Sequence, residues 1–205
     1  MEELSLFYRI NIMYENPIIQ KEYKVINMSK EIFINLEKEA FLGNVLDIGT
    51  ENHGIVYDLC KGIDDNITID YISGEEDKGK IEKDFFDSCV IFFSLFDIKS
   101  TYRKNNLIKD ICTFLKKDGI LYLWDVDKPR FKSIYIKLKV VVPSKGFRQV
   151  KINARNPLVD ASCKTTCKLL KQYFNIIDLK QSDNIYYIKA QKKGCILSEN
   201  IVDSH

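Results

Sequence analysis

An acidic residue and a glycine end a short apolar stretch in the first quarter of the chain. Asp47 and Gly49 stand where a predicted strand, 44–49, turns into a predicted helix, 52–61. In an open α/β sheet, ligands bind in the crevice beyond the carboxyl ends of the strands. Gly49 allows a sharp turn there, and the start of the helix offers free N–H groups. These residues predict a ligand site, although a tight strand–helix connection also explains the glycine.

Positive charge is concentrated in one segment of a chain whose total charge is nearly neutral. The 205 residues carry 31 basic and 29 acidic side chains, so the whole-chain charge does not indicate a nucleic-acid binder. Nine basic residues lie between Lys128 and Arg155, and no acidic residue lies there. Apolar and polar residues alternate from Ile134 to Val140, which predicts a basic β-hairpin. The hairpin is either a solvated ribbon or a surface that receives an anionic ligand.

Strands and helices alternate along the rest of the chain. Apolar spacing predicts helices over 29–40, 161–174 and from Ser100 to the Asp118-Gly119 pair, and strands over 67–72, 87–95, 120–126, 176–179 and 184–190. This alternation favours an α/β fold with a largely parallel sheet. We divide the chain into an N-terminal extension (1–28), one domain (29–193, with the hairpin as an insert at 128–155) and a C-terminal tail (194–205).

Six cysteines are scattered along the sequence, and none forms a C-x-x-C pair. We predict reduced thiols and no metal site, with a metal or redox pair at Cys163 and Cys167 as the alternative. No segment approaches the ~20 apolar residues of a membrane helix, and the N-terminal residues do not resemble a signal peptide. The predicted location is the cytoplasm, away from membranes.

Several segments, in order, resemble the class I S-adenosylmethionine-dependent methyltransferases. VLDIGT (45–50) is similar to the family's nucleotide loop, FDSCVI (86–91) to its fourth strand, and LKKDGIL (115–121) to the turn before its fifth strand. The last two predicted strands resemble the family's antiparallel sixth and seventh strands. The resemblance covers residues 30–193. It implies a Rossmann-like α/β fold with a mostly parallel sheet, an antiparallel final strand and an inserted basic hairpin.

The resemblance also implies S-adenosylmethionine as cofactor and places residues around it. Asp47 and Gly49 would line its methionine end, Asp70 would accept hydrogen bonds from the ribose hydroxyls, and Ser94 would face the methyl group. The full predicted cofactor-binding set is Asp47, Gly49, Thr50, Glu51, Asp70, Tyr71 and Ser94. No catalytic residue is predicted, because an in-line displacement depends mainly on positioning. His53 and Asp97 are either a base or ordinary surface residues.

The sequence departs from the family pattern in two places. Glu51 stands where glycine is usual, and Asp87 lies 17 positions after Asp70, too few for the family's next helix and strand. Either a helix–strand unit is reduced here, or the strand at 67–72 is the family's third and the second is missing. Two functions stay open: a methyltransferase with an unidentified acceptor, anionic if the hairpin receives it, or a catalytically inactive methyltransferase-like binding module.

Overall fold

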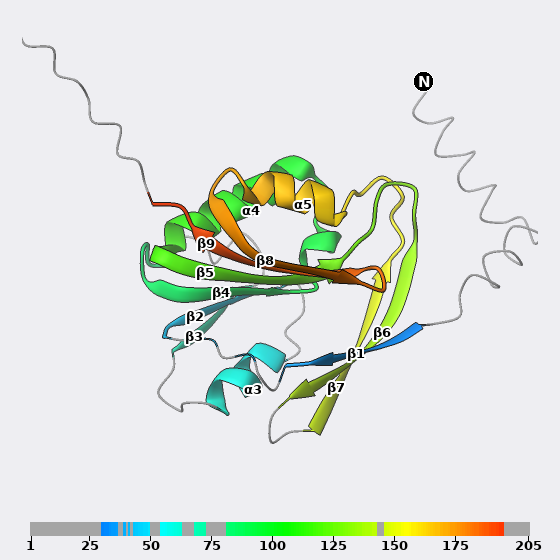
Figure 1. Cartoon of the computed structure of the whole chain (residues 1–205), viewed down its shortest axis with the longest axis horizontal. Coiled ribbons are helices and arrows are strands. Elements are labelled where there is room, and N and C mark those ends of the chain that lie inside the picture. The colour runs from blue at the N-terminus through cyan, green and yellow to red at the C-terminus, as the bar shows by residue number, and fades with distance from the viewer. Residues whose placement is uncertain are drawn as a thin grey trace, which may run out of the picture.

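Two β-sheets and three α-helices organise the described residues of the computed structural model (Figure 1). The structure describes residues 30–36, 39, 41, 43–49, 54–62, 68–72, 81–142 and 146–194. The predicted extension, 1–28, and the tail from 195 onward lie outside them. Within these ranges, no helix combines the length and the apolar character needed to cross a membrane.

The larger sheet has six strands and carries the predicted ligand-binding edge. Its order is β3 (Ile69–Ile72), β2 (Val45–Ile48), β4 (Phe86–Phe92), β5 (Leu115–Val126), β9 (Ile185–Lys192) and β8 (Phe174–Ser182). The first four strands are parallel neighbours, whereas β9 runs antiparallel to both β5 and β8. The predicted parallel sheet with an antiparallel final strand is therefore confirmed.

Helices cover the two faces of this sheet unequally (Figure 1). Helices α4 (Thr101–Phe114) and α5 (Cys163–Leu170) pack on one face, where they bury apolar side chains of β4, β5 and β9. Helix α3 (Ile55–Lys61) lies on the other face together with the second sheet. Each of the three helices lies within a predicted helical segment, and the predicted start of α3 at residue 52 lies outside the described residues. The helix predicted over 161–174 is too long, because α5 ends at Leu170 and Phe174 already begins β8.

The second sheet consists of β1 (Lys30–Asn35), β6 (Ile134–Val142) and β7 (Gly146–Ala154), with β6 in the centre. Strands β6 and β7 pair antiparallel and form the predicted hairpin. Every second residue of β6, from Ile134 to Val142, is buried against the larger sheet. The period of two read from the sequence is confirmed, because one face of the hairpin covers the core.

The helix predicted over 29–40 is wrong, because residues 30–35 form strand β1. Ile32, Ile34 and Leu36 alternate inward and join the core below the larger sheet. Strand β1 pairs in parallel with β6, more than a hundred residues later in the chain. A window of neighbouring residues does not contain that partner, so the helical spacing of the apolar residues was misleading.

The end predicted for the helix that begins after Ser100 is also wrong. Helix α4 stops at Phe114 instead of continuing to Asp118-Gly119. Leu115 already has extended backbone dihedrals and pairs with Phe86 at the start of β4. Because Leu115 pairs with a strand that lies far away in the sequence, the helix ends four residues before the predicted stop at Asp118.

The short spacing after Asp70 corresponds to a sheet without a further strand in the described residues. Strand β3 lies directly beside β2, so the strand that carries Asp70 occupies the place of the family's second strand. No described strand pairs with the other edge of β3. This topology favours a reduced helix–strand unit over loss of the second strand.

A glycine fixes the start of β2. It lies at the amino ends of the strands, whereas the ligand site lies at their carboxyl ends. Gly43 has a positive φ of 69°, and a Cβ there would overlap the Asp87 carboxylate. That carboxylate accepts a hydrogen bond from the Asn44 N–H (2.9 Å) and pairs with Lys116 (2.8 Å). Gly43 therefore precedes strand β2 and does not follow a helix, because residues 30–35 form a strand.

Candidate functional site

The carboxyl ends of β2 and β4 bring three of the predicted site residues to one edge of the sheet. Asp47 lies in the last part of β2, and Gly49 follows that strand directly. Ser94 follows β4, the strand that pairs with β2. Its buried hydroxyl donates a hydrogen bond to the Phe92 carbonyl (3.1 Å), which holds the turn after β4.

Asp47 is a buried carboxylate without a compensating partner in the described part of the chain. Its side chain is 9% exposed, and no described residue pairs with it or donates a hydrogen bond to it. Burial raises its pKa from 3.8 to about 7, because a charge loses hydration there. Its charge also adds to the effect of burial in raising the pKa of Cys60 to about 11. A cation placed beside Asp47 would relieve this cost.

The remaining members of the predicted set are only partly located. Asp70 lies within β3 opposite Leu46 and is exposed. Directly opposed residues of paired strands share a face of the sheet, so Asp70 and Asp47 lie on opposite faces. Tyr71 is opposite Asp47, but its side chain, like all of Thr50, Glu51 and His53, lies outside the described residues. The assignment of Asp70 to the ribose stays a prediction.

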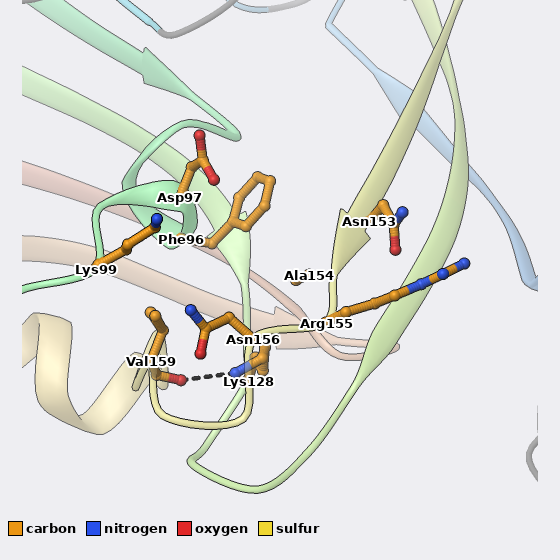
Figure 2. A pocket seen from close by; sticks show the side chains of 9 residues that line it. All are labelled: Phe96, Asp97, Lys99, Lys128, Asn153, Ala154, Arg155, Asn156 and Val159. Atoms are coloured by element: carbon orange, nitrogen blue, oxygen red, sulfur yellow. Dashed lines mark hydrogen bonds between the residues drawn. The ribbon is translucent and has the colours of Figure 1, made fainter. Parts of the chain in front are cut away.

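A small pocket opens beside this edge, beyond the ends of β4 and β5 (Figure 2). Its volume is about 80 Å³, well below the ~300–1,000 Å³ of sites that enclose a drug-sized ligand. Phe96, Asp97 and Lys99 come from the segment after β4 and lie across the pocket from the end of β7 (Figure 2). The other lining residues are Lys128, Asn153, Ala154, Arg155, Asn156 and Val159.

A buried carboxylate holds the wall of this pocket in place. Asp125 is fully buried in β5, and its Oδ2 accepts a hydrogen bond from the Phe96 N–H (2.8 Å). Its Oδ1 accepts another from the N–H of Val126 (2.7 Å). Burial raises the pKa of Asp125 to about 7 although these hydrogen bonds and the charge of Lys104 oppose the shift. Asp125 thus positions the segment that carries Phe96 and Asp97.

Two buried lysines tie the neighbouring loop to this wall. Lys104 on α4 donates to the Asp160 carbonyl (2.7 Å), and Lys128 donates to the Val159 carbonyl (2.6 Å; Figure 2). Burial lowers the pKa of both ammonium groups, and the negative charge of Asp160 counters this shift in each. For Lys104, the charge of Asp125 counters it more strongly. These contacts fix the 156–160 loop as the second wall of the pocket.

Sequence reasoning missed Lys104, whose position contains a usable signal. It lies four residues before Ile108 and seven before Ile111, on the buried face of α4. A lysine in an apolar stripe indicates a buried partner. Asp127, directly after β5, accepts a hydrogen bond from the Cys163 N–H at the start of α5 (2.9 Å).

The nine basic residues of the Lys128–Arg155 segment do not form one continuous surface. Lys128 is buried, Arg148 pairs with Asp58 on α3 (2.7 Å), and Lys132 donates to the Asn184 side chain (2.7 Å). Lys145 lies outside the described residues. Arg155 is exposed and lines the pocket, whereas the remaining lysines of the strands lie on the outer face of the second sheet.

The five described cysteines are free thiols. Cys163 and Cys167 lie one helical turn apart, with their Sγ atoms 3.9 Å from each other. Burial raises the pKa of Cys163 to about 12, which keeps it protonated near neutral pH. The described residues contain no cluster of histidine, cysteine or carboxylate side chains arranged to hold a metal ion.

The fold is that of a methyltransferase. The CcbJ methyltransferase from Streptomyces caelestis superposes with a TM-score of 0.51 at 9% identity, over 75% of this chain and 90% of that one. The structure of PigF with SAH gives a TM-score of 0.51 at 11% identity, over 77% and 60% of the two chains. An S-adenosylmethionine-dependent methyltransferase from Mesorhizobium loti reaches 0.49 at 12% identity, over 75% and 93%. The assignment of the fold rests on the first two.

Comparisons of sequence add no closer relationship. No protein-family model matches the chain, and no curated protein matches it. At identities of 9–11%, the structural likeness establishes the architecture of the sheet and its helices. The activity and the ligand must be argued from the site itself.

Proposed function

We propose that this protein is an S-adenosylmethionine-dependent methyltransferase that acts on an acceptor with an anionic group. The observation that supports this most is the uncompensated, buried carboxylate of Asp47 at the carboxyl end of β2, beside Gly49. In an open α/β sheet this edge is the ligand-binding one. When bound, S-adenosylmethionine supplies a methyl group on a positively charged sulfur.

The residues at this edge fit a cationic ligand. Burial keeps the pKa of Asp47 near 7, so its charge is costly until an opposite charge lies beside it. Asp47 would therefore hold the cationic methionine end. Gly49 would let the backbone approach the ligand closely, since it has no side chain to obstruct it.

The small pocket supports a separate place for the acceptor. Its lining includes three cations, Lys99, Lys128 and Arg155, and one carboxylate, Asp97. A pocket of about 80 Å³ would receive only the reacting end of an acceptor and not a whole molecule. Lys99 and Arg155 would bind an anionic group, and Asp97 would take the proton that the attacking hydroxyl or amine loses. The proposal places the protein in the cytoplasm, where free cysteines are common.

Isothermal titration calorimetry with S-adenosylmethionine and S-adenosylhomocysteine tests the proposal. The wild-type protein is expected to bind both, and Asp47→Ala and Gly49→Val are expected to lose most of the affinity. Asp178→Ala is a matched control, because Asp178 lies on β8 at the far edge of the same sheet. Asp70→Ala tests the ribose assignment separately.

The same titration distinguishes the second candidate function, a catalytically inactive binding module. No described strand pairs with the outer edge of β3, which favours that alternative because the described sheet ends next to Asp70. If a folded wild-type protein binds neither compound at millimolar concentration, the methyltransferase proposal is wrong and the alternative stands.

A further inference from the structure

The outer face of the second sheet combines exposed aromatic rings with lysines. Alternation along the three strands turns Ile32 and Ile34 of β1 toward the core and Phe33 outward. The same alternation turns Lys137 and Lys139 of β6 outward, as it does Phe147 and Lys151 of β7. Because β1 joins the hairpin in parallel, residues from distant parts of the sequence share this face.

Two phenylalanines dominate the face. Phe33 is 68% exposed and Phe147 is 64% exposed, which is unusual for aromatic side chains. Lys139 lies between them, with its Nζ 5.3 Å from the centre of the Phe33 ring and 5.8 Å from that of Phe147. The rings stand on the two outer strands of the sheet, about 10 Å apart at the usual strand spacing.

The charge on this face is positive and partly unpaired. Lys139 forms an ion pair with Glu31 (3.0 Å). Lys137 and Lys151 oppose each other across β6 and β7, and neither forms an ion pair with a described residue. Directly opposed like charges destabilise a sheet. An anion that lies across both strands would reduce the repulsion between the two ammonium groups.

We propose that this face binds single-stranded nucleic acid, with bases stacked on Phe33 and Phe147 and the phosphate backbone held by Lys137, Lys139 and Lys151. Exposed rings accept the face of any unpaired base, and lysines along the strand neutralise its phosphates. A duplex fits less well, because its bases are already stacked on each other. The proposal is independent of the methyltransferase site.

Charge disfavours a second copy of the chain as the occupant. Two such faces brought together would oppose three lysines and one glutamate with the same set, and like charges across an interface are costly. An anionic polymer complements the net positive charge instead. The basic hairpin alone does not carry both rings, because Phe33 comes from β1 and Phe147 from β7.

Fluorescence anisotropy with a labelled oligothymidylate of about 12 nucleotides tests the proposal, since such a length spans one typical site. The wild-type protein is expected to bind at low salt, and removal of each ring by Phe33→Ala and Phe147→Ala is expected to weaken binding about fivefold or more. Phe131→Ala is the matched control, because that ring is 80% exposed elsewhere. Because all three rings are highly exposed, these substitutions are expected to leave the fold intact, so a loss of binding is not explained by unfolding.

The lysines are tested through the salt dependence of binding. Lys137→Gln combined with Lys151→Gln removes two cations and is expected to lower the slope of log K against log salt by about 1.4. Lys109→Gln combined with Lys117→Gln removes two exposed lysines on α4 and β5 and is expected to leave the slope unchanged.

Three results would overturn the proposal. The first is that the wild-type protein does not bind the oligonucleotide at about 50 mM salt, where phosphate contacts are strong. A duplex of the same length could bind as tightly, with no effect of the phenylalanine substitutions. Sedimentation could instead detect a dimer that the phenylalanine substitutions dissociate, which would assign the face to a second copy of the chain.

Discussion

Replacing Asp47 with asparagine is expected to stabilise the protein while it removes the affinity for S-adenosylmethionine. The substitution keeps the size of the side chain and removes the charge. Burial raises the pKa of Asp47 from 3.8 to about 7, so the folded state holds a proton that the unfolded state releases between these values. Stability of the wild-type protein therefore falls as the pH rises through this range, and the variant lacks that loss.

The size of the effect follows from the two pKa values. The difference between 3.8 and about 7 corresponds to about 4 kcal/mol at 1.36 kcal/mol per pKa unit. This is an upper limit, reached at about pH 8, where Asp47 is charged in both states. At about pH 4 the wild-type protein and Asp47→Asn are expected to have similar stability, because the folded wild-type carboxyl group is neutral there. The corresponding rise in Tm at about pH 8 is on the order of 10 °C.

Urea denaturation of both proteins at the two pH values measures this difference, and calorimetry measures ligand binding. The wild-type affinity for S-adenosylmethionine is expected to fall as the pH decreases below 7, since the ligand's cations need the charged carboxylate. Asp47→Asn is expected to show weak binding without this dependence. Equal or lower stability of the variant at about pH 8 would refute the reasoning, because it would mean that the Asp47 charge is already compensated in the free protein.

Three further substitutions test individual contacts of the pocket wall and of the fold. Asp125→Ala leaves two buried N–H donors without their acceptor and is expected to cost about 2–4 kcal/mol in urea denaturation; an unchanged midpoint would contradict its positioning role. Gly43→Ala is expected to cost about 1–3 kcal/mol, and less in combination with Asp87→Ala, since the new Cβ overlaps that carboxylate; full additivity in a double-mutant cycle would argue against the overlap. Tyr186→Phe removes the buried hydrogen bond to Thr166 (2.9 Å) and is expected to cost about 1 kcal/mol, with little further loss when Thr166→Val is added.

Local sequence patterns predicted the secondary structure correctly where the apolar pattern of a segment matches the way its own side chains are buried. The apolar stretch of β4 and the period of two in β6 predicted strands that the structure confirms, because one or both faces of each strand are buried. The acid and glycine at the carboxyl end of β2 predict a ligand-binding edge, since a parallel strand followed by a helix places them there, and their role in binding stays a prediction.

Local patterns failed where a distant partner decided the conformation. Ile32, Phe33 and Leu36 fit a helix as well as a strand, and only pairing with β6 selects the strand. The partners of Lys104 were likewise not predictable, because Asp125 and Asp160 lie on distant segments of the chain. The departure at Glu51 stays untested, because that residue lies outside the described part of the chain.

The sequence by itself determined the alternating α/β order, the basic hairpin and the residues that end β2. Each of these depends on neighbours a few positions apart. Only the tertiary structure decided three features of the molecule. Asp47 is buried and forms no ion pair or hydrogen bond with a described side chain, Asp125 accepts a hydrogen bond from the Phe96 N–H, and the Phe33 ring lies beside Lys139 of β6. Burial and contacts across strands depend on which distant segments pair, and pairing is set by the packing of the whole core.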